Sequence, residues 1–170
     1  MSDILQKDSP KLRQISQPVK IRQINTKEIS SAIKKMSQAL SKEEDGVALA
    51  APQIGIPWRI FIISEKVFID NKNPIAQDLV FINPVLTKLS RKKVILDEGC
   101  LSVRPLYGKV KRSDKATVEA FDEKGKKFSW SASGLIAQIF QHEIDHLNGI
   151  LFIDKATNIR EINLSELEEI

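Results

Sequence analysis

The most distinctive chemical pattern in this sequence is an HExxH segment, His142 to His146, with Glu143 between the two histidines. On a helix, residues four apart lie one turn apart on the same face, so both imidazoles can bind one cation. The glutamate can then act on a water molecule at that cation. Leu135 and Ile139 continue the histidine stripe as an apolar face, and the chain has no other histidine, which argues against a chance match on a surface helix. Buried histidines without partners would be unfavourable, so we predict that this pair binds a metal ion.

A catalytic metal site of this kind needs a third protein ligand. The candidates are a downstream carboxylate, Glu161 or Glu166, and the thiol of Cys100, the only cysteine. A lone cysteine is usually a small buried hydrophobe, but a thiolate is a good ligand for zinc or ferrous iron. Cys100 follows Gly99, which allows a tight turn after a predicted strand. Since one cysteine and two histidines would leave a position open for water, as in catalytic sites, we favour Cys100.

A third segment, from Gly46 to Gly55, is rich in small residues and carries Gln53 among apolar neighbours. Small residues let the backbone approach a ligand closely, and a buried glutamine would then need a polar partner. The alternative is a tight turn packed on the core with Gln53 exposed. The sequence alone does not separate these two interpretations.

Hydrophobic periodicity predicts two helices that frame the chain. Residues 27–41 follow a capping signal at Thr26 and place apolar residues at helical spacing. Residues 133–148 form the predicted metal-binding helix, and Gly149 stands where a helix C-terminus favours glycine. The first 25 residues are expected to be irregular, and a short helix is expected to carry Leu164, Leu167 and Ile170.

The middle of the chain predicts strands, the first of which, 58–64, is buried. The others are expected over 78–83, 85–89, 93–96, 116–121 and 127–130, with a loop at 66–78 and a hairpin turn at 122–125. The predicted fold is therefore α+β, with a mostly antiparallel sheet packed on a C-terminal metal-binding helix, and with an N-terminal helix.

Composition indicates a single catalytic domain over residues 1–170, since 42% of the residues are hydrophobic and 28% charged. No apolar run has membrane-spanning length and the start lacks the features of a secretion signal, so we expect a cytoplasmic protein without membrane contact. The net charge of +4 is mild. The basic clusters lack interleaved aromatic residues, so no specific nucleic-acid binding is expected.

Taken together, three segments resemble the motifs of the peptide deformylase family. They are the small-residue segment Gly46 to Gln53, the EGCLS segment Glu98 to Ser102, and the QHExDH segment Gln141 to His146. The resemblance extends more weakly over most of residues 8–155. It implies an enzyme that removes the N-formyl group from the formylmethionine of newly made polypeptides.

The resemblance also implies the roles of individual residues. Cys100, His142 and His146 would bind the metal, usually Fe²⁺ in the cell, with Zn²⁺ or Ni²⁺ as substitutes. Glu143 would act as general base and then acid, while Gln53 and the backbone N–H of Leu101 would stabilise the oxyanion. A transient contact with the ribosome is a further expectation, although the tail has no Lys or Arg after Arg160 to form a basic docking helix.

Substrate contacts can be placed by helical geometry, because Leu135 and Ile139 lie two turns and one turn before His142. We expect them to hold the methionine side chain, with Val47 as the opposite wall and with Gly46 and Ala48 beside the substrate backbone. Leu135 and Ile139 could instead be ordinary core residues.

This sequence departs from the family pattern at two positions. Ala48 stands where a second glycine is usual, and Arg104-Pro105 follows Val103 where a proline more often comes directly. Near the central motif, Arg112 is expected to pair with Glu98 and hold the ligand loop, with a solvated arginine as the alternative.

Two competing functions remain. One is an HExxH zinc peptidase that uses Glu161 or Glu166 as third ligand. The other is a metal-stabilised binding protein without turnover, against which Glu143 argues, since a structural site has no use for it.

Overall fold

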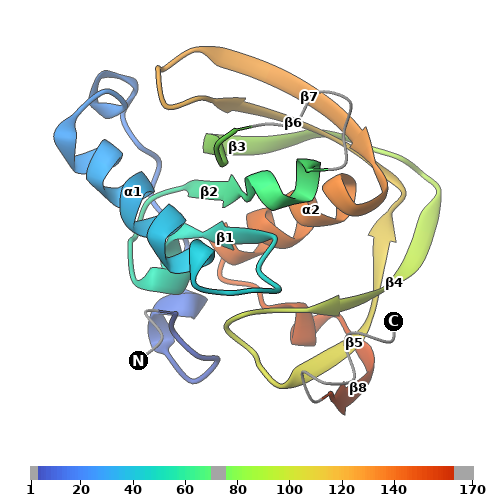
Figure 1. The fold of residues 1–170 in the computed structure, drawn as a ribbon. Helices are drawn as coiled ribbons and strands as arrows, with labels where there is room; N and C mark the ends of the chain where they lie inside the picture. Colours follow the sequence, from blue (N-terminus) through green and yellow to red (C-terminus); the bar gives the residue numbers. More distant parts are fainter. Residues whose placement is uncertain (1–3, 70–75, 163–170) are drawn as a thin grey trace.

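The computed structural model describes residues 4–69 and 76–162, and within them two α-helices accompany two antiparallel sheets (Figure 1). The helices are α1 (Lys27–Ser41) and α2 (Gly134–Leu147). The five-stranded sheet has the order β1 (Ala48–Ala50), β2 (Ile60–Ile63), β3 (Leu79–Leu89), β6 (Lys115–Phe121) and β7 (Lys127–Ser133). The three-stranded sheet has the order β4 (Lys93–Gly99), β5 (Leu106–Ser113) and β8 (Thr157–Glu161). The predicted α+β fold is confirmed, but its strands divide into two sheets.

Each face of the five-stranded sheet is covered by one helix. In β2, Phe61 and Ile63 belong to the core cluster that contains α2, whereas Ile60 and Ile62 belong to the cluster that contains α1. Both faces of this strand are therefore buried, which explains its uninterrupted apolar run. Figure 1 shows α2 in the middle of the molecule, with the three-stranded sheet on its other side.

Helix α1 spans the predicted residues. The hydroxyl oxygen of Thr26 accepts a hydrogen bond from the backbone N–H of Ile29, which caps the first turn. Ile29, Met36 and Leu40 are buried against the sheet. The apolar period therefore predicted both the helix and the face that it buries.

Helix α2 is one residue shorter at each end than predicted. At its C-terminus, Gly149 has a φ of +74°, and a Cβ there would lie 2.5 Å from the carbonyl oxygen of Arg13. The glycine thus permits both the left-handed turn and the close approach of the N-terminal segment. No helix among the described residues is long and apolar enough to cross a membrane.

Several strands differ from the prediction. β3 is continuous through Pro84, because Asn83 takes a positive φ of 51° at an irregularity between Ile82 and Val85. β1, β5 and β8 were not predicted as strands. Residues 4–25 contain two short 3₁₀ helices, Pro10–Arg13 and Ile21–Gln23, within otherwise irregular chain. The helix expected to carry Leu164, Leu167 and Ile170 lies outside the described residues, as do residues 70–75 of the expected loop.

Candidate active site

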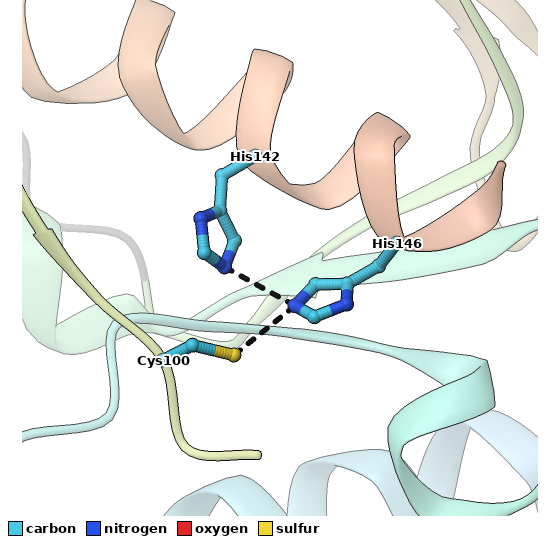
Figure 2. Close-up of side chains that lie close together, drawn as sticks. All are labelled: Cys100, His142 and His146. Atoms are coloured by element: carbon cyan, nitrogen blue, oxygen red, sulfur yellow. Dashed lines mark hydrogen bonds between the residues drawn. The ribbon is translucent and has the colours of Figure 1, made fainter. Parts of the chain in front are cut away.

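Three potential metal ligands converge from two elements of the fold (Figure 2). Cys100 follows the end of β4, while His142 and His146 lie one turn apart on α2. Nε2 of His146 lies 3.2 Å from Sγ of Cys100 and 3.1 Å from Nε2 of His142. One ligand atom from each of the three residues lies within 4.8 Å of the others. The structure therefore brings together the three residues that the sequence singled out.

The donor set fits a single first-row metal ion. Metal–ligand bonds of about 2.0–2.3 Å in a tetrahedral arrangement place N and S donors roughly 3.3–3.6 Å apart. The distances from Nε2 of His146 to Sγ of Cys100 and to Nε2 of His142 are close to this range. Within the described residues, no other group of histidine, cysteine and acidic side chains has ligand atoms placed for one ion. Glu161, a candidate in the competing zinc-peptidase interpretation, is exposed on β8 and outside this cluster. Glu166 lies outside the described residues.

A buried network orients His142. Its Nδ1 lies 2.5 Å from Oε1 of Glu98, which leaves Nε2 facing the other two donors. Arg112 donates two hydrogen bonds to Glu98, of 3.0 and 2.6 Å, and a third, of 2.6 Å, to Asp145. The predicted contact between Arg112 and Glu98 is thus confirmed, and both side chains are only 4% exposed. Burial opposes ionisation of Glu98, but the hydrogen bonds from His142 and Arg112 lower its pKa to about 2, so the carboxylate is charged.

Glu143 lies directly after His142 on α2. Its side chain lines the cleft, yet its Oε2 is buried and has no hydrogen-bond partner among the described residues. Burial raises the pKa of Glu143 to about 7, and the negative charge of Glu98 adds to this, while His142 and Arg112 oppose it. A carboxyl group whose pKa lies near neutrality can both accept and return a proton.

Gln53 is buried, so the exposed-turn interpretation of its segment is wrong. It is 2% exposed, and its Oε1 accepts a hydrogen bond of 2.8 Å from the backbone N–H of Ala50. Its Nε2 donates to Oγ of Ser102 at 3.0 Å and lies 3.6 Å from Sγ of Cys100. The amide is therefore fixed with its donor nitrogen beside Cys100, one of the three potential metal ligands.

An open cleft of about 220 Å³ lies over these residues. All the expected substrate-contacting and oxyanion-binding residues line it, namely Gly46, Val47, Ala48, Gln53, Leu101, Leu135 and Ile139. Ile139 is 4% exposed and Leu135 is 51% exposed, so the stripe on α2 runs from the core to the mouth of the cleft. Ala48 takes no positive φ, so its methyl group is accommodated within β1 without strain.

Sequence reasoning did not assign Tyr107, Gln138 or Arg104 to the cleft, although each lines it. Gln138 lies four residues before His142 on α2, so helical spacing could have revealed it. Tyr107 pairs with Gly99 across β4 and β5, and a Cβ on Gly99 would lie 2.2 Å from the tyrosine ring. Because β5 was not predicted, this contact could not be inferred from the sequence.

Comparison with known proteins decides the family. A sequence model described as polypeptide deformylase matches residues 1–161. The chain belongs to the peptide deformylase family. It is 38% identical over 154 residues to a peptide deformylase of Rhizobium meliloti (strain 1021), covering 89% of this chain and 82% of that protein.

Solved peptide deformylases share the fold. The enzyme of Legionella pneumophila superposes with a TM-score of 0.79 at 36% identity, covering 91% of this chain and 85% of the other. A peptide deformylase of Synechococcus elongatus, solved in complex with actinonin, gives a TM-score of 0.77 at 34% identity, covering 98% and 81%. This member of the family is accordingly a metal-dependent hydrolase that removes the N-formyl group from newly made polypeptides.

Proposed function

We propose that Cys100, His142 and His146 bind one divalent metal ion, Fe²⁺ in the cell, and that the formyl group of formylmethionine is hydrolysed beside it. The observation that carries this proposal is the convergence of the three donor atoms at a cleft that Glu143 also lines. One thiolate and two imidazoles suit ferrous iron, with Zn²⁺ or Ni²⁺ as substitutes. When bound, such an ion would acidify a water molecule and polarise the formyl carbonyl.

Glu143 handles the proton in this proposal. Its Oε2 takes a proton from the attacking water and passes it to the nitrogen of the leaving amine. Glu143 lines the cleft, and its buried Oε2 has no hydrogen-bond partner among the described residues, so no neighbouring group is bonded to it. The network around Glu98 keeps the His142 ring fixed while Glu143 exchanges the proton.

The oxyanion is stabilised by Gln53 and by the backbone N–H of Leu101. The amide nitrogen of Gln53 carries two N–H groups, of which one is used by Ser102. The other donates to Sγ of Cys100 at 3.6 Å, so it lies beside the proposed metal ligands and is shared with the oxyanion during the reaction. A donor held in place before reaction stabilises the developing charge without reorganisation.

The methionine side chain lies against Ile139 and Leu135, with Val47 on the facing wall. Gly46 and Ala48 precede and begin β1, which is an edge strand of its sheet. An extended substrate backbone can run beside such an edge. All five residues border the cleft that Cys100 and His142 also line.

We further propose that residues 1–170 form one catalytic domain that works in the cytoplasm. Its substrates are newly made polypeptides, which it meets through a transient contact with the ribosome.

The test is deformylation of formyl-Met peptides by the iron-loaded protein under anaerobic conditions. Glu143→Gln keeps the shape of the side chain but cannot accept the proton, so we expect a loss of at least ~100-fold in kcat. Its metal content should stay near one ion per chain. Glu28→Gln, an exposed position on α1, is the matched control and should behave as the parent. Near-normal kcat in Glu143→Gln would remove this residue from the mechanism.

A further inference from the structure

Arg104 connects two walls of the cleft. It lies in the loop between β4 and β5, and its Nη1 donates to Oε2 of Glu43 at 2.6 Å. Its Nη2 donates to Oδ1 of Asp45. Both carboxylates belong to the loop between α1 and β1. Arg104 and Asp45 also line the cleft, so the contacts cross its mouth.

Each of the two loops is held by its own backbone turn. In the first, the N–H of Gly46 donates to the carbonyl of Glu43 at 3.2 Å. In the second, the N–H of Val103 donates to the carbonyl of Cys100 at 3.0 Å, and that of Leu106 donates to the carbonyl of Val103 at 3.0 Å. Each loop is thus a defined unit, and the contacts of Arg104 join one unit to the other.

The two units carry different parts of the proposed substrate site. The first presents Gly46 and Val47, and the second presents Cys100 and Leu101. The metal ligands have separate support, since Glu98 holds His142 and Gln53 lies beside Cys100. Loss of the bridge would therefore change the spacing of the walls more than the arrangement of the metal ligands.

We propose that Arg104 is a positioning residue for substrate binding, which holds the two walls of the cleft at the separation that a formyl-Met peptide requires. This inference rests on the proposed assignment of Gly46, Val47 and Leu101 to substrate contacts. A planar guanidinium with several donors suits the task, because it can engage two carboxylates at once.

The expected effect is modest, because the bridge is partly exposed. The side chains of Arg104, Glu43 and Asp45 are 29%, 15% and 36% exposed to solvent, so solvent and salt screen the ion pairs. We expect Arg104→Gln to raise KM for a formyl-Met tripeptide about three- to tenfold. We expect kcat to stay within about twofold of the parent, because the reacting groups are held by other contacts.

The experiment compares Arg104→Gln, Arg104→Lys and the parent in their metal-loaded forms. Arg104→Lys should restore part of the affinity, because an ammonium can reach one carboxylate but not bridge both as a planar group does. In the parent, raising the salt concentration should increase KM towards that of Arg104→Gln, whereas KM of Arg104→Gln should respond less. Asp45→Asn weakens the bridge from the other loop and serves if Arg104→Gln does not fold.

Arg13→Gln is the matched control. Arg13 makes a comparable partly exposed pair with Asp154, 2.5 Å apart, and it does not line the cleft. Its loss should leave KM unchanged. An equal rise of KM in Arg13→Gln would mean that a general loss of rigidity in the protein, and not loss of the bridge, causes the effect.

Two further outcomes would overturn the proposal. One is an unchanged KM in both Arg104→Gln and Asp45→Asn. The other is a parallel loss of kcat and metal content in Arg104→Gln, which would mean that Arg104 supports the metal ligands instead. Absence of deformylation by the parent would reject the proposed function itself, so the two failures are distinguishable.

Discussion

Replacing Arg112 with alanine should weaken both the fold and the metal site, because this side chain joins two buried carboxylates. Arg112 contacts Glu98 from β4 and Asp145 from α2, so it links the three-stranded sheet to the helix that carries the histidines. Alanine would leave both carboxylates without their arginine. The effect on stability and the effect on metal binding can be measured separately.

The size of the stability loss follows from what each carboxylate retains. Removing one partner of a buried ion pair costs about 3–5 kcal/mol. Glu98 keeps His142 at 2.5 Å, and both oxygens of Asp145 keep Nζ of Lys155 at 2.7 Å. We therefore expect the lower end, about 3 kcal/mol, which lowers the midpoint of thermal unfolding by roughly 6–12 °C in a domain of this size. Because Glu98 orients His142, metal affinity should fall about 10- to 100-fold.

The assay is urea and thermal unfolding of the metal-free and zinc-loaded proteins, together with metal competition against a chelator. Lys109→Ala is the matched control on the same strand. Its ion pair with Asp97 is 45% and 51% exposed, so its loss should change stability by less than about 1 kcal/mol. If Arg112→Ala loses no more stability than this control and keeps its metal affinity, the buried network does not support the site.

Three other changes test the proposed chemistry. Ile139→Trp should reduce kcat/KM for formyl-Met peptides far more than for formyl-Ala peptides, and an equal loss for both would place the methionine pocket elsewhere. Gln53→Ala should lower kcat about 10²–10³-fold with metal content retained, and a change confined to KM would count against a role in oxyanion stabilisation. The iron form should lose activity in air faster than the nickel or zinc form, because both Cys100 and ferrous iron are open to oxidation; equal stability of the three forms would contradict the pairing of cysteine with iron.

The sequence predicted those elements whose packing follows their own apolar pattern. Helix α1 buries the positions that its helical spacing defines, and strand β2 buries an uninterrupted apolar run on both faces, so local pattern was enough. Strand β5 was missed because one of its inward positions is Arg112. That arginine is buried only because carboxylates 14 and 33 residues away meet it. A charge neutralised by distant residues looks like a surface residue when the sequence is considered alone.

Some residues of the candidate site could likewise be predicted from the sequence, and others could not. The three proposed metal ligands could be selected by residue type and spacing, and the structure brings them together. The two interpretations of Gln53 could be separated only by its contacts with Ala50 and Ser102, which depend on how β1 lies against the β4–β5 loop. The bridge formed by Arg104 could not be predicted for the same reason. It depends on the approach of two loops whose contacting residues are 61 and 59 positions apart in the sequence.

Helix α2 is constrained on both of its faces, and this affects where substitutions can weaken the binding of an inhibitor. Ala137, Phe140 and Leu147 are fully buried in the core, while His142 and His146 converge with Cys100 on the proposed metal site and Glu143 lines the cleft. A substitution on either face would damage the fold or the chemistry, so an inhibitor anchored there meets a surface that the organism cannot readily alter. The mouth of the cleft is different, because Val47 and Leu135 are 40% and 51% exposed. Resistance to such an inhibitor is therefore expected to arise at these exposed positions, and compounds confined to the deep part of the cleft should retain their potency longest.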